Sequence, residues 1–231
     1  MRILHDLAGA GDCRFSPHCW RAKMALMHKG LEFETSPVPF TGILKILDGS
    51  HKTVPVLEDD NMVVSDSFQI ALHLEEAYPD RPTLFGGPGG VAAARFVEQW
   101  ANTMVNAAIV KLIAADIHGR LTPEDQAYFR ESRERRFGAS LEALAQGREA
   151  KVENIRTALT PARRTLEMQP FLGGEGPLFT DYILFGTLQW VRVTSDLEIV
   201  ETGDTIARWF EACLDLYDGL GRSMEPAGQA A

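Results

Sequence analysis

The sequence is poor in cysteine and has no long apolar run. Its three cysteines, Cys13, Cys19 and Cys213, are an odd number in 231 residues, so a disulfide framework is not expected. No stretch reaches the roughly 18 uninterrupted apolar residues that a membrane-spanning helix needs. The start, MRILHDLAGAG, lacks the apolar segment of a signal peptide. We therefore expect a soluble chain in the reducing cytoplasm, without a membrane partner.

Positive charge is also scarce. Lysine and arginine number 23 against 32 aspartate and glutamate residues, which gives a formal net charge of -9. An acidic chain is poorly suited to following a phosphate backbone, so no nucleic-acid partner is expected. Hydrophobic residues make up 45% of the chain, which excludes disorder as its main state.

The usual signals for metal and phosphate chemistry are missing. None of the six histidines forms an i, i+4 pair with another or a tight cluster with the cysteines, so no metal is expected. The glycine-rich run 86–90 lacks the Lys-Ser/Thr ending of a phosphate-binding loop. The Gly-x-Ser-x-Gly elbow of a serine hydrolase is absent too.

The first 84 residues contain short apolar runs separated by turn residues. Their order is β-α-β-α-β-β-α, which predicts a mixed sheet covered by helices. Strands are expected at 3–7, 31–35, 54–58 and 62–64, and helices at 17–29, 40–47 and 67–78.

After a glycine-rich linker at 85–90, strand signals disappear. Residues 91–222 show helical spacing, and residues 223–231 are expected to form a loose tail. The helices are expected at 91–115, 123–146, 150–168, 181–194 and 205–216. The sequence thus predicts an α/β domain at 1–84 and an all-α domain at 91–222.

The most informative segment runs from Phe15 to Arg21. Ser16 stands where a side chain caps a helix, and Pro17 suits the first helical turn. Free N–H groups and the helix dipole favour negative charge at such a position. Ser16 occupies the place of the first cysteine in a Cys-x-x-Cys motif; its hydroxyl cannot exchange disulfides but can donate a hydrogen bond to a thiolate. A plain N-cap is the alternative.

Two further segments carry unusual polar or proline residues. Pro55 removes a ladder donor from an apolar strand, which places it at an edge or a special turn, such as a cis Val54–Pro55 bond. An open strand edge there can pair with an extended peptide. Asp66 and Ser67 begin a helix, where they suit a ligand with a carboxylate and an ammonium group. Ordinary N-capping is again the alternative.

Together these segments resemble the cytosolic glutathione transferases, which combine a thioredoxin-like domain with a helical domain. The resemblance implies that Ser16 is the catalytic serine of the zeta and theta classes. It implies that Val54, before a cis-proline, pairs with the glutathione backbone, and that Asp66 and Ser67 hold the γ-glutamyl end. Lys52 is a candidate for the glycyl carboxylate, with a solvated lysine as its alternative. Phe40 is a candidate neighbour of the tripeptide, with a core role as its alternative.

The chain also resembles the bacterial lignin β-etherases, which depend on glutathione. The shared motifs are Ser16-Pro17, 20–23, 25–30, 40–44, 78–82 and 214–222. This implies that glutathione, as co-substrate, attacks a small aromatic electrophile at the β-carbon of an aryl ether and expels a phenolate. The electrophile is expected between the domains. The family resemblance also implies a homodimer.

Two alternatives remain open for function. A zeta-like isomerase or dehalogenase is supported by Ser16, Trp20 and Arg21 and would act on small anionic substrates. A noncatalytic ligand binder of the same fold is the other. The chain also departs from the family pattern, because Leu178 stands where a capping Ser or Asn precedes Asp181. Thr180 is therefore expected to cap a shortened helix.

Overall fold

A four-stranded mixed sheet forms the first part of the chain. The computed structural model describes residues 1–229, so residues 230 and 231 of the predicted tail lie outside the described residues. The strands are β1 (Arg2–Leu7), β2 (Glu34–Val38), β3 (Val56–Asp59) and β4 (Met62–Ser65), in the order β2-β1-β3-β4. β1 is parallel to β2 and antiparallel to β3, and β4 is antiparallel to β3. The predicted mixed sheet is confirmed.

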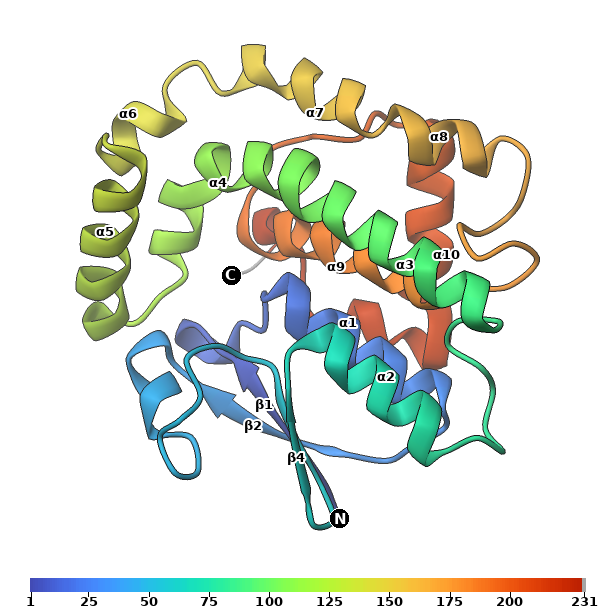
Figure 1. The fold of residues 1–231 in the computed structure, drawn as a ribbon. Coiled ribbons are helices and arrows are strands. Elements are labelled where there is room, and N and C mark those ends of the chain that lie inside the picture. Colours follow the sequence, from blue (N-terminus) through green and yellow to red (C-terminus); the bar gives the residue numbers. More distant parts are fainter. Residues whose placement is uncertain (230–231) are drawn as a thin grey trace.

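Helices α1 (Pro17–His28) and α2 (Ser67–Ala77) lie between the sheet and the remaining helices (Figure 1). Two short 3-10 turns, η1 (Ala10–Asp12) and η2 (Phe40–Lys45), complete this part, with η2 in place of the helix predicted at 40–47.

Strand β2 lies three residues later than the sequence predicts. The reason is the end of α1, where Gly30 has φ +63° and the Leu31 N–H donates to the Leu26 carbonyl at 3.0 Å. Leu31 thus closes the helix instead of starting a strand. Pro37 is tolerated in β2 because β2 is an edge strand.

The second part of the described chain is helical. Its elements are α3 (Pro88–Trp100), the π-helical η3 (Ala101–Asn106), α4 (Ala107–Gly119), α5 (Pro123–Phe137), α6 (Leu141–Ala145), η4 (Glu149–Lys151), α7 (Val152–Ala158), α8 (Thr160–Leu166), α9 (Phe179–Thr194), α10 (Thr205–Gly219), η5 (Leu220–Ser223) and η6 (Ala227–Gln229). α3 begins inside the predicted linker, and the predicted helix 123–146 breaks at Gly138, which has φ +69°. Among residues 1–229, no helix is long and apolar enough to span a membrane. The thioredoxin-like α/β part followed by an all-helical part is as predicted, while the exact domain boundaries stay predictions.

Helix α9 begins without the side-chain cap that its family pattern would supply. Its first residue is Phe179, so the prediction that Thr180 caps a shortened helix is wrong. The side chain of Leu178 has no acceptor atom, but the Asp181 carboxylate, inside the helix, accepts from the Leu178 N–H at 3.0 Å. The same carboxylate accepts from the Leu172 N–H at 2.7 Å, the Gly173 N–H at 2.9 Å and the Trp209 indole at 2.9 Å.

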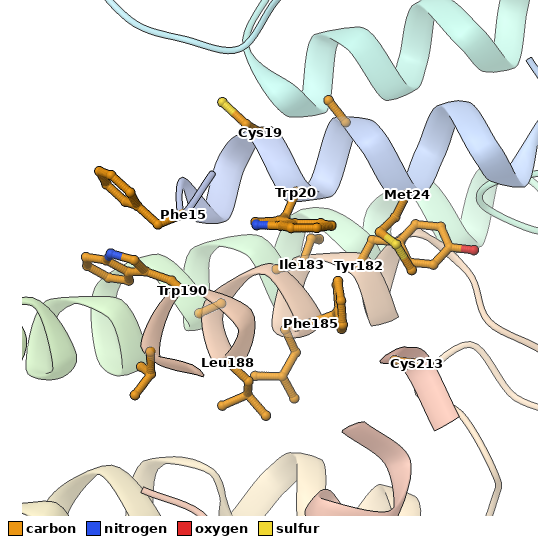
Figure 2. Packing of buried hydrophobic residues seen from close by; sticks show 14 of the residues in the cluster. Phe15, Cys19, Trp20, Met24, Tyr182, Ile183, Phe185, Leu188, Trp190 and Cys213 are labelled. Carbon is orange, nitrogen blue, oxygen red and sulfur yellow. The ribbon is translucent and has the colours of Figure 1, made fainter. Parts of the chain in front are cut away.

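The main core lies where α1 crosses α9 (Figure 2). Trp20 of α1 meets Phe185 of α9 edge to face, with ring centroids 6.0 Å apart. The crossing is close because α9 carries a glycine there: a Cβ on Gly186 would stand 2.3 Å from the Pro17 carbonyl oxygen. The helical part therefore fixes the position of the first turn of α1.

Residues 220–229 pack against the rest of the chain. The Arg14 N–H donates to the Met224 sulfur at 3.3 Å, and the Arg192 guanidinium donates to the Met224 carbonyl at 2.7 Å. Arg120 donates to the Ala227 carbonyl at 2.7 Å. These bonds lie in the segment where the sequence predicts a loose tail.

Candidate functional site

Ser16 caps the N-terminus of α1. Its Oγ accepts a hydrogen bond from the Cys19 N–H at 3.3 Å, and Pro17 occupies the first helical turn. The first N–H groups of a helix have no helical partner, so this end of α1 favours an anion. Cys19 is fully buried, and burial raises the pKa of its thiol, which therefore stays protonated near neutral pH. The predicted cap is confirmed, and the thiolate role of Ser16 stays a prediction.

The Val54–Pro55 peptide bond is cis, as the sequence suggested. The Pro55 carbonyl accepts from the Asp66 N–H at 3.2 Å, so this turn lies directly beside the start of α2. Val54 lies two residues before β3, outside the strand ladder. The backbone of Val54 therefore lies next to Asp66, so both residues could contact one bound peptide.

Asp66 and Ser67 form a polar pair at the start of α2. The exposed Asp66 has φ +75° and accepts from the Phe68 N–H at 2.9 Å and the Gln69 N–H at 3.1 Å. Ser67 is fully buried, and its hydroxyl has no hydrogen-bond partner among residues 1–229. A buried hydroxyl without a partner is costly, so Ser67 is suited to receive a ligand group. The N-cap alternative thus explains Asp66 and leaves Ser67 unexplained.

A buried arginine lies beside this pair. Arg21 of α1 donates from Nη2 to the Asn102 Oδ1 at 3.0 Å, and its Nη1 lies 3.8 Å from the Glu98 Oε1. Burial lowers the pKa of Arg21 to about 10, and the carboxylates of Glu98 and Asp66 oppose that shift. The guanidinium therefore stays charged at neutral pH. Within residues 1–229, its Nε and Nη1 donate no hydrogen bond.

The π-helical segment η3 supplies Asn102, the hydrogen-bond acceptor of Arg21, while Glu98 belongs to α3. Asn102 and Asn106 share one face, and the Asn106 Nδ2 donates to the Asn102 Oδ1 at 3.2 Å. Thr187 of α9 donates to the Asn106 Oδ1 at 2.8 Å. A chain of hydrogen bonds thus joins α1, η3 and α9. π-helical turns are frequent at functional sites.

Phe40 lies between the two parts of the chain. Its ring centroid is 6.2 Å from that of Phe15 and 5.5 Å from that of Phe129. Its N–H donates to the Asp125 carboxylate at 2.8 Å, and the Thr41 N–H donates to the same carboxylate at 2.9 Å. Asp125 is fully buried in α5, so these hydrogen bonds anchor the segment at Phe40 and Thr41 to the helical part. The ring thus has the packing role that was its alternative, and the glutathione contact stays a prediction.

The other predicted site residue, Lys52, is exposed and forms no ion pair with residues 1–229. Its neighbour His51 hydrogen-bonds to the Ser65 hydroxyl at 2.7 Å, which holds this loop next to Asp66. Among residues 1–229, no group of three or more metal-ligating side chains comes together.

From the sequence, Arg21 counted only in favour of the zeta-like function, and Glu98 was not placed in the site. The available signal was buried charge inside a largely apolar helix, but Lys23 shares that signal, so it neither singles out Arg21 nor identifies its partners. His18 was also left without a role. Burial and the Arg21 charge lower the pKa of His18 to about 3, so its imidazole is neutral on the same turn of α1 as Ser16.

Comparison with known proteins decides the family. The family model described as glutathione S-transferase, N-terminal domain, matches residues 15–77, and the one described as glutathione S-transferase, C-terminal domain, matches residues 92–217, more than half of the chain. The chain belongs to the glutathione S-transferase family. Membership supports a glutathione transferase with glutathione as its co-substrate.

Three known proteins are similar to this glutathione S-transferase in sequence or structure. The chain is 26% identical to the glutathione S-transferase-like protein ustS of Aspergillus flavus, over 91% of this chain and 88% of that protein. It is 30% identical to a zeta class glutathione S-transferase of Euphorbia esula, over 55% of this chain and 59% of that one. The crystal structure of glutathione transferase GSTFuA3 from Phanerochaete chrysosporium is 28% identical, with a TM-score of 0.74 and coverage of 94% and 92%.

Proposed function

We propose that Ser16 stabilises the thiolate of bound glutathione, while Val54, Asp66 and Ser67 hold the tripeptide. The observation that carries this proposal is the position of the Ser16 hydroxyl at the N-terminus of α1, where an anion is favoured. The partnerless Ser67 hydroxyl supports it, because a γ-glutamyl carboxylate would satisfy that group. Lys52 would face the glycyl carboxylate.

The hydrogen bond from Ser16 and the N-terminus of α1 are together large enough to stabilise the thiolate. A free thiol has a pKa near 8.5, so lowering it by about 2 units requires roughly 2.7 kcal/mol. A hydrogen bond to a charged group contributes about 1.5–3 kcal/mol. A helix N-terminus adds up to about 2 kcal/mol in a partly buried site. Neither a metal nor a basic side chain is required.

The electrophile that we propose is a small aromatic β-aryl ether. The thiolate sulfur forms a bond to the β-carbon, the ether C–O bond breaks, and a phenolate leaves with the electron pair. Aromatic surroundings support this choice, since Phe15 precedes Ser16 and Phe40 lies against both Phe15 and Tyr128. Tyr128 is 48% exposed and so can contact a ligand.

One observation favours a second candidate function. The charged, buried Arg21 beside Asp66 suits a small anionic substrate of a zeta-like isomerase or dehalogenase. The similarity to the Euphorbia esula zeta class protein supports the same choice.

Replacing Ser16 by alanine is expected to lower glutathione-dependent phenol release from a racemic β-aryl ether dimer by about 10- to 100-fold, because about 1.4–2.7 kcal/mol of thiolate stabilisation is lost. The pKa of the bound thiol, followed by thiolate absorbance against pH, should rise by about 1–2 units. Ser67→Ala is the matched control and should weaken glutathione binding without moving that pKa. An unchanged thiol pKa and turnover in the Ser16 variant would remove Ser16 from the mechanism.

The wild-type result separates the candidate functions. Phenol release that requires glutathione supports the etherase. Consumption of an anionic α-halo acid without phenol release would favour the zeta-like function. Glutathione binding without turnover of either substrate would favour a noncatalytic ligand binder.

We also propose a homodimer. Large apolar side chains are exposed on β4 and α3, with Met62 56% exposed and Phe96 75% exposed. A second copy of this chain would cover them. Sedimentation at micromolar concentration should show a species of twice 25.5 kDa, and a monomer alone would contradict the proposal.

A further inference from the structure

Ser16 and its neighbour Phe15 are buried, with 5% and 2% of their surfaces exposed. If Ser16 holds the glutathione thiolate, an electrophile reaches the sulfur only after some part of the protein has moved. Enzymes with covered sites commonly open by the motion of a loop. The contacts around the turn that carries Ser16 indicate which part moves.

Two of these contacts are rigid. A Cβ on Gly186 of α9 would stand 2.3 Å from the Pro17 carbonyl oxygen. A Cβ on Gly9 would stand 2.3 Å from the Arg120 carbonyl oxygen, which also accepts from the Ala10 N–H at 2.8 Å. Backbone meets backbone in both places, so neither contact can open by the rotation of a side chain. α9 and the end of α4 therefore stay fixed on this turn.

A third contact is made by η2, and it depends on one side chain of another element. η2 begins after Pro39, whose side chain has no acceptor for the first N–H groups of the turn. The Asp125 carboxylate of α5 accepts instead, from the Phe40 N–H at 2.8 Å and from the Thr41 N–H and hydroxyl at 2.9 Å each. Figure 1 shows the start of α5 next to this segment, which is drawn in light blue. The helical part thus caps η2 from across the space between the two parts.

The Phe40 ring lies on Phe15 and is held in place by aromatic and cationic groups of α5. Its centroid is 6.2 Å from that of Phe15, 5.5 Å from that of Phe129 and 6.3 Å from that of Tyr128. The Arg133 guanidinium carbon lies 5.6 Å from the same centroid, in the range of a cation–π contact. Aromatic pairs at such distances are favourable for any flat ring. An aromatic ligand can therefore replace the contacts that α5 gives up when Phe40 swings away.

The remainder of η2 lies largely at the surface. All six of its residues are at least partly exposed, and Leu44 is 65% exposed. Ile46, which follows η2, is 4% exposed and packs against β2 and β3, so this end stays in place. Segments with few buried apolar contacts open at a low cost in free energy. Residues 40–45 can therefore swing between Pro39 and Ile46 once their contacts with α5 break.

We propose, on the basis of the function proposed above, that Phe40 is the gate through which an aromatic electrophile reaches the glutathione thiolate, and that Asp125 is the positioning residue that holds this gate shut. In the closed state, Phe40 lies on Phe15 and the three hydrogen bonds to Asp125 are intact. Opening breaks these bonds and moves the ring away from Phe15. The ring of the electrophile then takes its place against Phe129 and Tyr128.

The test is a stopped-flow measurement of S-benzylglutathione binding to the full-length chain, followed by tryptophan fluorescence. The benzyl group stands for the electrophile. Thr41→Val removes one of the three hydrogen bonds to Asp125. It is expected to raise both the association and the dissociation rate constant about 10-fold, since the open state becomes more populated by about that factor. Phe40→Ala, which removes the ring itself, is expected to raise both as well. A lost ligand contact without a gate would raise the dissociation rate constant alone.

Two variants are matched controls. Thr41→Ser keeps the hydroxyl donor and should bind at the wild-type rates. Thr165→Val removes a threonine hydroxyl that donates to the Pro161 carbonyl at 3.0 Å in α8, away from the segment 40–45 (Figure 1), and it should also bind at the wild-type rates. Circular dichroism should show that all variants are folded.

Hydrogen exchange followed by mass spectrometry gives a second reading of the gate. The peptide that contains residues 40–45 should exchange faster in Thr41→Val than in the wild type, because its amides lose protection when the gate opens. Unchanged rate constants in both Thr41→Val and Phe40→Ala, or no binding of S-benzylglutathione to the wild type, would overturn the gate. An error in the proposed role of Ser16 would show instead as unchanged phenol release in Ser16→Ala, and it would leave these binding rates as they are.

Discussion

Replacing Asp181 by alanine is expected to lower the free energy of unfolding by about 3–5 kcal/mol, because it leaves several buried donors without an acceptor. The carboxylate is fully buried and accepts from three backbone N–H groups and the Trp209 indole at 2.7–3.0 Å. Natural domains are stable by only about 5–15 kcal/mol, so this single change removes a large share of the total. Urea denaturation of the purified variant measures it.

Two controls separate the buried role of Asp181 from the loss of a carboxylate as such. Asp181→Asn keeps one acceptor oxygen and should recover part of the loss. Asp196→Ala removes an exposed carboxylate that pairs with Arg148 at 2.9 Å, and it should cost less than about 1 kcal/mol. If Asp181→Ala and Asp196→Ala had equal effects, the carboxylate would not organise the start of α9.

The sequence predicted the parts of the fold that depend on local chemistry. The start of α1 was predicted at Pro17 because a capping serine and a proline both mark that position. Strands β3 and β4 were predicted at 54–58 and 62–64, because turn residues separate two apolar runs there. The start of α9 was misjudged because its acceptor is not at the N-cap but at Asp181, inside the helix.

The candidate site likewise contains residues that local sequence predicts and residues that only the tertiary fold brings together. Ser16, Asp66 and Ser67 were found because helix starts are encoded by neighbouring residues. By contrast, the contact of Arg21 with Asn102 spans 81 residues, and that of Phe40 with Asp125 spans 85 residues. No local pattern encodes such pairs, because they depend on how the helical part folds back on the sheet.

A severe steric effect is expected from Gly186→Ala. A Cβ at this position would stand 2.3 Å from the Pro17 carbonyl oxygen, and both atoms belong to the backbone or Cβ of packed helices, so no side chain can rotate away. α1 and α9 would have to separate at the core crossing in Figure 2. Overpacking of this kind costs about 3 kcal/mol or occasionally more, which urea denaturation should show.

Gly186→Ala is also expected to lower the catalytic rate, because Pro17 follows Ser16 directly. Displacing the first turn of α1 by about 1 Å would lower kcat by about 100-fold if Ser16 holds the thiolate. The loss of stability does not depend on that role, so the two measurements separate the packing of α1 from the function of Ser16. Stability lost with kcat unchanged would mean that the reacting thiolate is held elsewhere.

Gly119→Ala is the matched control for this crossing. Gly119 also lies in a helix, at the end of α4, but no atom lies within 4 Å of the position that its Cβ would take. Alanine there removes conformational freedom from the unfolded chain without a clash, so the variant should be as stable as the wild type or up to about 1 kcal/mol more stable. If Gly186→Ala behaved like Gly119→Ala, α9 would not fix the start of α1, and Ser16 would have to be positioned by the sheet side of the helix alone.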